Sequence, residues 1–213
     1  MYNYSNLEEK LYMLEAETKV ETLHKGKFVS LMLHDNPKFK YEFTHEHRCG
    51  GHIVAVLPIH PDRGMLVRHE FTSCWDLEKL NLSSITGGWE QSRHPTPIDT
   101  VIEELREEAG IILNDEDQIM SLGTCRGAKS SDNMYHLFAA DLSSGFSEVD
   151  IETDGSHLES LAHNEWMPHG LQMDSLNGVQ WFDEGVDPLL YVLYTRFRFN
   201  IENLRVASRS DYK

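Results

Sequence analysis

The sequence is poor in cysteine and lacks long apolar runs. Its three cysteines, Cys49, Cys74 and Cys125, are odd in number, far apart and without C-x-x-C spacing. This pattern favours neither a disulfide framework nor a zinc knuckle. No apolar run approaches the ~20 residues that a membrane-spanning helix needs, and the first residues lack the basic and apolar regions of a signal peptide. These absences predict a cytoplasmic protein without a membrane partner.

The chain is also short of positive charge. Its 19 Lys and Arg residues stand against 35 Asp and Glu residues, which gives a net charge of −16. The average field therefore repels a phosphate backbone, and no basic stripe overcomes it, so extended nucleic acid is not a predicted partner. A small phosphorylated ligand remains compatible with this charge, because a divalent cation held by carboxylates reverses the local potential.

The length of 213 residues allows one principal domain with a small appendage. We predict an N-terminal extension at residues 1–48, with a short amphipathic helix at 5–17 and antiparallel strands within 20–34 and 39–43. The principal domain, residues 49–213, is predicted to contain strands, one helix after a Gly-Gly pair, a mobile loop and a C-terminal helix. Their expected positions are strands at 52–58, 64–70, ending near 85–86, 134–140 and 165–168, helices at 97–109 and 188–197, and the loop at 142–157.

The helix predicted at 97–109 has clear signals at both ends. Thr96 can cap its N-terminus, Pro97 suits its first position, and the Asp99 carboxylate can reach back to the cap. Gly110 supplies the stop. These signals predict a helix that begins at Pro97 and ends at about Ala109.

Carboxylates gather on one face of this helix. At ~100° per residue, Glu104, Glu107 and Glu108 lie together beside an apolar stripe formed by Ile98, Val101, Ile102, Leu105 and Ala109. Like charges at these spacings cost ~0.2–0.5 kcal/mol per pair, and a bound hard cation such as Mg²⁺ or Mn²⁺ would remove that cost. The alternative is a solvated acidic face without a ligand.

The stretch from Gly88 to Ile111, GWEQSRHPTPIDTVIEELREEAGI, resembles the Nudix box, G-x5-E-x7-R-E-U-x-E-E-x-G-U. Its second half matches well, but the spacing from Gly88 is one residue longer and Glu103 stands at the arginine position. The first glutamate position falls on His94 or Pro95, which cannot replace a carboxylate. In the family the arginine orients the glutamates; Arg93 and Arg106 are candidates to compensate for its loss.

The resemblance extends over roughly residues 24–200 and is strongest to ADP-ribose pyrophosphatases. GKFVSLML, GGHIVAVLPIHPDRGMLVRHEF, GAKSSDNMYHLFAADL and EWMPHG are similar to segments of those enzymes. It implies an α+β protein with the Nudix fold, an α/β/α sandwich with a mixed central sheet, and a small N-terminal helix and strand extension. It also implies a homodimer in which the N-terminal strands exchange and build the nucleoside pocket.

The reaction implied by the resemblance is metal-dependent hydrolysis of a diphosphate linkage in ADP-ribose or a related nucleotide sugar, with a metal-activated water attacking one phosphorus. The implied Mg²⁺ or Mn²⁺ ligands are the Gly87 carbonyl, Glu104, Glu107 and Glu108. The general base is either Glu104 or a carboxylate of a later loop, for which Glu159 is the candidate; Glu159 is otherwise an ordinary exposed residue.

Two arginines are candidates for binding substrate phosphate. Arg68 matches a strand arginine of the family, and Arg126 is placed to enter the same cleft from a following strand. Each has a structural ion pair as its alternative. A second function also stays open, a Nudix domain that binds a nucleotide as a sensor or interaction module without hydrolysing it, because Glu103 and the missing first glutamate depart from the box.

Overall fold

The computed structural model is a mixed α+β structure rich in strands, and it describes residues 17–72, 78–151, 161–168 and 186–210. The chain divides into two compact units. Residues up to His52 with Arg126–Met134 form the first, and Ile53–Cys125 with Tyr135 onward form the second. The boundary predicted after residue 48 precedes this one, and the inclusion of Arg126–Met134 in the first unit had no signal in the sequence. The helix predicted at 5–17 lies outside the described residues, apart from its last residue.

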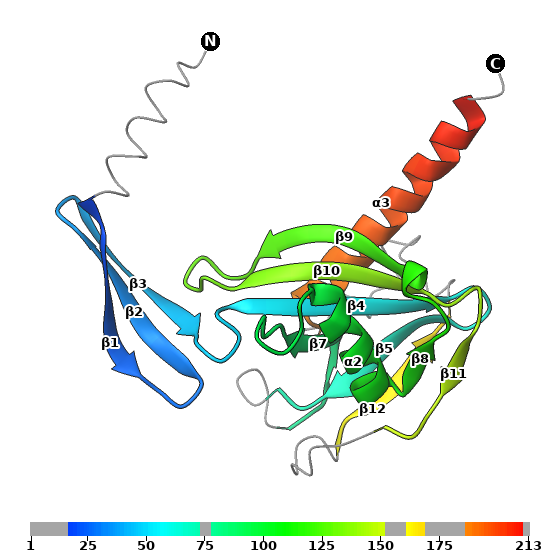
Figure 1. Cartoon of the computed structure of the whole chain (residues 1–213), viewed down its shortest axis with the longest axis horizontal. Coiled ribbons are helices and arrows are strands. Elements are labelled where there is room, and N and C mark those ends of the chain that lie inside the picture. The colour runs from blue at the N-terminus through cyan, green and yellow to red at the C-terminus, as the bar shows by residue number, and fades with distance from the viewer. Residues whose placement is uncertain (1–16, 73–77, 152–160, 169–185, 211–213) are drawn as a thin grey trace. The chain divides into compact units, whose positions relative to one another are not determined.

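The first unit contains the predicted antiparallel strands. They are β1 (Lys19–Lys25), β2 (Val29–Asn36) and β3 (Phe39–Glu46), in the order β1-β2-β3 (Figure 1). Gly26 occupies the first turn, where a Cβ would lie 2.6 Å from the carbonyl oxygen of Val29. Asn36 and Phe39 face each other across the second turn. The three strands confirm the turn signals at Gly26 and Asp35-Asn36-Pro37.

The second unit is built on a mixed sheet. Its main path is β12-β5-β4-β10-β9, while β6 pairs with β5 and β7 with β4. The backbone N–H groups of Met134 and Leu142 donate to the carbonyls of Gly51 and Ile59 with the same offset, so β10 runs parallel to β4, whereas β5 is antiparallel to it. The strands are β4 (His52–His60), β5 (Gly64–Glu70), β6 (Asn81–Ser83), β7 (Ile85–Gly88), β9 (Ile119–Arg126), β10 (Met134–Asp141) and β12 (His163–Met167).

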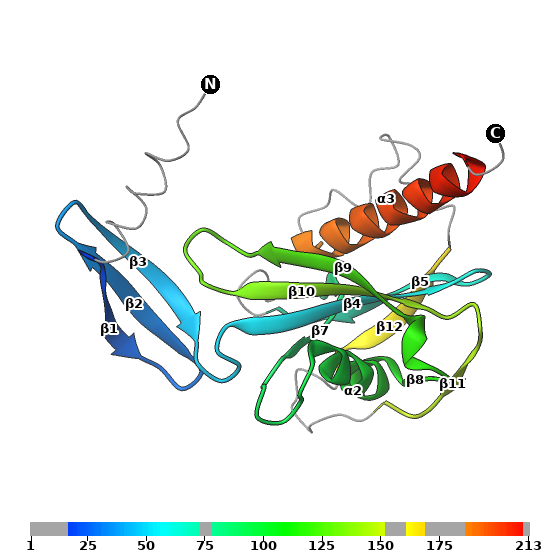
Figure 2. The same cartoon turned by 45° about the horizontal axis from the view of Figure 1, so that its top comes forward.

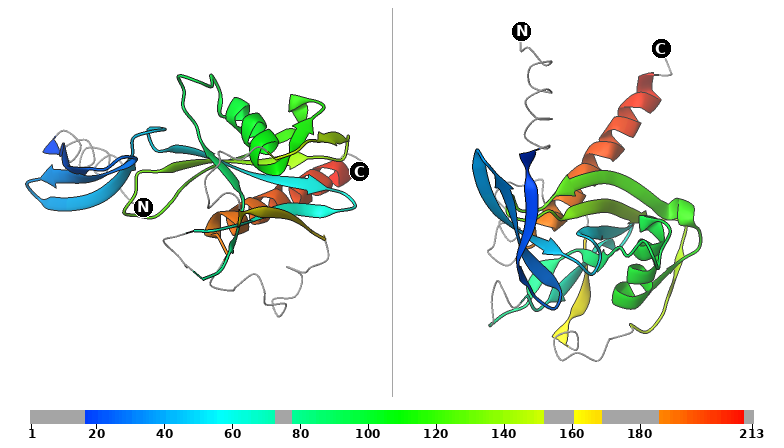
Figure 3. Two further views of the ribbon diagram at one scale, coloured as in Figure 1. Left: turned by 90° about the horizontal axis from the view of Figure 1, so that it is seen from below. Right: turned by 60° about the vertical axis from the view of Figure 1, so that its left-hand side comes forward.

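Alternating side chains of this sheet supply two separate cores. Val54 and Val56 of β4 pack in the cluster that includes Val101 and Leu105 of α2 (Pro97–Ala109). Ala55 and Leu57 face the opposite way and pack with Leu190, Leu193 and Phe197 of α3 (Pro188–Ser210). Successive strand residues point to opposite faces, so the two helices cover opposite sides of one sheet (Figures 2 and 3).

Several element bounds differ from those predicted. β7 begins at Ile85 instead of ending near it, because Thr86, Gly87 and Gly88 continue the antiparallel pairing with β4. The predicted loop at 142–157 contains β11 (Phe146–Glu148), which pairs with β8 (Ile111–Leu113). A short 3-10 helix, η1 (Glu116–Gln118), follows β8. α3 extends well past Phe197. In the described residues, neither helix combines the length and the apolar character that crossing a membrane requires.

Candidate functional site

Local capping sets the position of the carboxylate-bearing helix. The Thr96 hydroxyl accepts a hydrogen bond from the Asp99 N–H, and the Asp99 carboxylate accepts from the Thr96 N–H at 2.8 Å. At the other end Gly110 has φ +66° and donates its N–H to the Leu105 carbonyl, a left-handed conformation that glycine adopts without a steric cost. The predicted bounds of α2 are therefore confirmed. Buried Val101 and Leu105 anchor it on the sheet, which leaves the glutamates on its flank.

Gly87 and Glu104 meet where β7 passes α2. A Cβ built on Gly87 would lie 2.5 Å from the Glu104 Cγ and closer still to its carboxyl group. Only a residue without a side chain lets the carboxyl approach the backbone of β7 so closely. The two residues expected to share a metal are thus in contact in the structure.

The Glu104 carboxyl is electrostatically costly to ionise. Burial, the largest cause, and the neighbouring Glu108, Glu107 and Glu103 together raise its pKa from 4.5 to about 8, while Arg93 acts in the opposite direction. Within the described part of the chain, no hydrogen bond or ion pair to this carboxyl compensates for the burial. A strongly perturbed carboxyl with like-charged neighbours is typical of functional sites.

Glu103, which occupies the arginine position of the box, is neutralised by the loop before the helix. One oxygen of its carboxylate forms an ion pair with Arg93, and the other lies 2.9 Å from His94 Nε2. The loop is itself held by hydrogen bonds from the N–H groups of Arg93 and His94 to the Glu90 carbonyl. Of the two arginines considered for compensation, Arg93 is therefore the partner of Glu103.

The other two glutamates each contact an arginine. Arg106 Nη2 lies 2.8 Å from the Glu107 carboxylate on the surface of α2. Arg68 of β5 lies beneath the last turn, where its Nη2 is 3.9 Å from the Glu108 carboxylate and its Nη1 donates to the Glu108 carbonyl at 3.0 Å. Among the residues that the structure describes, no arginine forms such a contact with Glu104.

The donor chemistry of this face fits a hard divalent cation, although the ligands are not gathered around one point. Carboxylate oxygens are the groups that Mg²⁺ and Mn²⁺ prefer, and neutralising Glu104 would remove the cost of its ionisation. Among the described residues, no three His, Cys, Asp or Glu side chains are assembled at metal-binding geometry.

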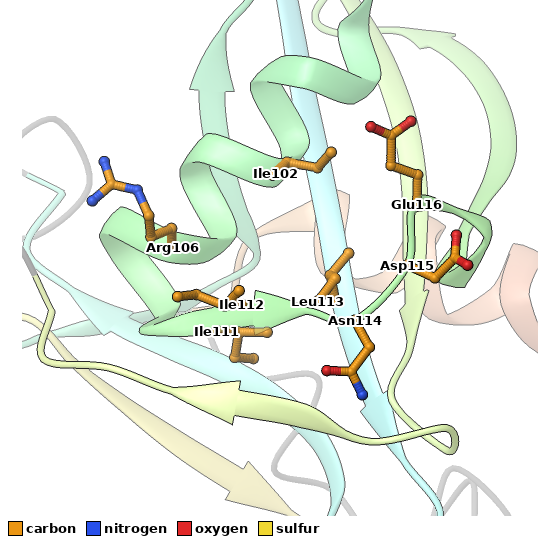
Figure 4. Close-up of a pocket in the computed structure, with 8 residues that line it drawn as sticks. All are labelled: Ile102, Arg106, Ile111, Ile112, Leu113, Asn114, Asp115 and Glu116. Carbon is orange, nitrogen blue, oxygen red and sulfur yellow. The ribbon is translucent and has the colours of Figure 1, made fainter.

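A pocket of about 300 Å³ adjoins the same helix but is not the carboxylate face. Ile102 and Arg106 of α2 line it together with residues of β8 and the start of η1 (Figure 4). Its remaining lining residues are Ile111, Ile112, Leu113, Asn114, Asp115 and Glu116. Glu104, Glu107 and Glu108 do not belong to this lining, so the cavity and the acidic face are separate features.

The remaining predicted site residues lie in different places. Arg68 is only 5% exposed, and its role as a phosphate ligand stays a prediction. Arg126 belongs to the first unit, where its Nη1 donates to the Asp132 carbonyl at 2.7 Å. Glu159 lies outside the described residues. Asn164 of β12 was not predicted; its amide donates to the Glu108 carbonyl at 2.7 Å, and nothing local in the sequence signals this contact.

Similarity to known proteins is found among solved structures. No family model and no curated protein matches the chain. Among solved structures, it is similar to the C-terminal domain of mouse MUTYH in its crystal structure with human PCNA. That similarity has a TM-score of 0.45 and 10% sequence identity, and covers 71% of this chain and 89% of the other.

Proposed function

We propose that this chain is a Nudix-type hydrolase that cleaves the diphosphate linkage of a nucleoside diphosphate derivative. The proposed substrate is ADP-ribose or a related nucleotide sugar, and the products are a nucleoside monophosphate and a sugar phosphate. The box resemblance of residues 88–111 and the placement of α2 and α3 on opposite faces of a mixed sheet support the α/β/α sandwich of the Nudix fold.

One observation carries the proposal. The Glu104 carboxyl is packed against Gly87 and its pKa is raised to about 8 by burial and by Glu108, Glu107 and Glu103. A solvated acidic face would not bury one of its carboxyls among the others, because burial of an unpaired charge destabilises the fold. A cation-binding face that becomes neutral on binding has a physical reason for this arrangement.

In this proposal Glu104, Glu107 and Glu108, with the Gly87 carbonyl, would hold Mg²⁺ or Mn²⁺. The cation supplies charge neutralisation on the diphosphate and activation of the attacking water. Glu104 is one proposed general base, because a carboxylate beside the bound water can accept its proton. Glu159 remains the other proposed base, and Arg126 a proposed phosphate ligand.

The decisive assay is release of nucleoside monophosphate and sugar phosphate from ADP-ribose, other nucleotide sugars and dinucleoside polyphosphates, with Mg²⁺ or Mn²⁺. Wild type is expected to turn over at least one of them only with the cation. Glu107→Gln and Glu108→Gln are each expected to lose at least about 100-fold, because each removes one anionic oxygen donor. Glu116→Gln, an exposed change outside α2, is the matched control and should keep wild-type activity. Cation-independent turnover, or full activity in both variants, would contradict the proposal.

A nucleotide-binding module without hydrolase activity is the second candidate. The engagement of Glu107 by Arg106 and of Glu108 by Arg68 favours it, since both carboxylates are satisfied without a metal. In the assay above, this function predicts saturable nucleotide binding with no product under any cation.

We also propose a homodimer formed through the N-terminal strands. Among the described residues, the sheet of the first unit leaves several large apolar side chains exposed, and small sheets gain independent stability by burying such side chains. These side chains are Val20, Leu23, Phe28, Val29, Leu31, Phe39 and Tyr41. The register places Val29 and Leu31 on one face of the sheet and Val20, Phe39 and Tyr41 on the other. A second copy packed on the Leu31 face would bury Val29 and Leu31.

Sedimentation equilibrium tests this assembly. Wild type is expected at twice the chain mass of 24.6 kDa, and Leu31→Lys at the mass of one chain, because a lysine on the covered face leaves a charge without water. Ile112→Lys is the matched control, since Ile112 is 42% exposed in the second unit, compared with 36% for Leu31. A wild type that sediments as a single chain would refute the dimer.

A further inference from the structure

Arg68 is a buried cation that contacts the helix of the proposed active site twice. It is 5% exposed and sits in β5. Its Nη1 donates to the Glu108 carbonyl at 3.0 Å, and its Nη2 lies 3.9 Å from the Glu108 carboxylate. Its Nε lies 3.5 Å from the Glu70 carboxylate and forms no hydrogen bond within the described part of the chain. A buried guanidinium is tolerated only with such compensation, so these contacts define its orientation.

The backbone contact belongs to the end of the helix. Glu108 is in the last turn of α2, where carbonyls have no partner within the helix. Its carbonyl accepts from Arg68 and also from the Asn164 amide at 2.7 Å. These two donors face each other across the β12–β5 pairing. The capping role is therefore shared by two residues, whereas the contact with the Glu108 carboxylate is made by Arg68.

The box arginine that would orient the glutamates is absent, because Glu103 occupies its position and is engaged with Arg93 and His94. We propose that Arg68 replaces it from β5, as the positioning residue that holds the Glu108 carboxylate and the last turn of α2 in place for the cation. This inference rests on the proposed function. In this role Arg68 contacts Glu108, a proposed ligand of the cation, and does not bind the substrate phosphate.

Mn²⁺ affinity distinguishes a positioning role of Arg68 from the effect of its charge alone, because losing one or the other changes the affinity in opposite directions. Removing a nearby positive charge by itself strengthens cation binding. Loss of a residue that orients a metal ligand weakens it by about 10–100-fold. We therefore expect Arg68→Gln to weaken Mn²⁺ binding about 10-fold or more, measured by titration of free Mn²⁺ in the absence of substrate. Arg68→Lys keeps the charge but not the two-pronged geometry, and should weaken binding in the same direction. Melting curves establish that each variant is folded.

Two further variants make the test specific. Asn164→Ala removes the other hydrogen bond to the Glu108 carbonyl and is expected to change Mn²⁺ affinity less than about twofold. In a Glu108→Gln background, Arg68→Gln is expected to cause no additional loss, because the carboxylate that it orients is gone. Equal losses in Asn164→Ala and Arg68→Gln, an undiminished loss in the Glu108→Gln background, or wild-type affinity in both Arg68 variants would each overturn the inference.

The outcomes also distinguish this inference from the proposed function. Mn²⁺ binding that weakens as expected in a protein that hydrolyses no substrate would refute the hydrolase and leave the positioning role of Arg68 standing. A wild type that hydrolyses with Mn²⁺ but tolerates the Arg68 substitutions would do the reverse. A wild type that binds no Mn²⁺ would refute both.

Discussion

Replacing Gly87 with alanine is expected to lower cation-dependent hydrolysis by at least about 100-fold and to leave the melting temperature within a few degrees of wild type. The new Cβ would overlap the Glu104 carboxyl group, and a flexible side chain yields more readily than the backbone of β7. Displacing a reacting group by about 1 Å is enough for a loss of this size. Stability changes little, because the displaced carboxyl regains water and is no longer held among other acidic groups.

The measurements are the hydrolysis rate on the substrate that the panel identifies, Mn²⁺ affinity, and thermal unfolding. The control is the same substitution in a Glu104→Ala background, where the overlapping atoms are absent. There Gly87→Ala should cause little further change in any of the three. Near-wild-type activity of Gly87→Ala would show that Glu104 does not work from its place against β7, and would remove the main support for the proposed site.

The second large effect is that Mn²⁺ reverses the order of thermal stability of wild type and Glu104→Gln. Without divalent cations at pH 8 and above, Glu104→Gln is expected to melt on the order of 5 °C higher, because wild type must either ionise a buried carboxyl or keep a proton on it. With saturating Mn²⁺ the order should invert, since the carboxylate binds the cation and the amide binds it more weakly.

The pH dependence follows from the direction of the pKa shift. The pKa of Glu104 is 4.5 in an ordinary setting and about 8 in the folded chain, so between these values the folded state holds a proton that the unfolded state has lost. Stability attributable to Glu104 therefore falls as pH rises from 4.5 to 8 and is constant above. The difference between variant and wild type should be absent below pH 4.5 and largest above pH 8.

Urea or thermal unfolding from pH 4 to 9 measures this difference. Glu42→Gln, an exposed glutamate of β3, is the control and should follow the wild-type profile, because its carboxyl gains no burial on folding. A Glu104→Gln profile parallel to wild type across the whole range would mean that Glu104 is well hydrated, and that a solvated acidic face describes α2 better than a cation site.

Part of the candidate site is readable from residues close together in the chain. The bounds of α2 follow from Thr96, Asp99 and Gly110, whose capping contacts span at most one helical turn. The grouping of Glu104, Glu107 and Glu108 follows from helical periodicity alone. The hairpin of β4 and β5 is similarly local, because its turn at His60–Arg63 and the alternation on both sides lie within one short stretch.

Other elements depend on pairing between distant segments and had no reliable local signal. β11 lies in a stretch rich in Ser, Gly and Asp that predicts a loop, but its strand forms because Phe146 pairs with Leu113. The extension of β7 through Gly87 and Gly88 likewise depends on β4, since glycine weakens a strand that lacks a strong partner.

The sequence by itself determined the helix, its ends and the face on which its carboxylates gather, because capping and periodicity act between residues a few positions apart. The tertiary structure alone decided the surroundings of each carboxylate. Glu104 is buried against Gly87, and the Glu108 carboxylate lies 3.9 Å from Arg68, which together with Asn164 donates to the Glu108 carbonyl. These contacts exist because β7, β5 and β12 are brought under α2 only when the sheet forms. Burial and ion pairing are properties of that packing, and they distinguish a costly, functional carboxylate from an ordinary one on the surface.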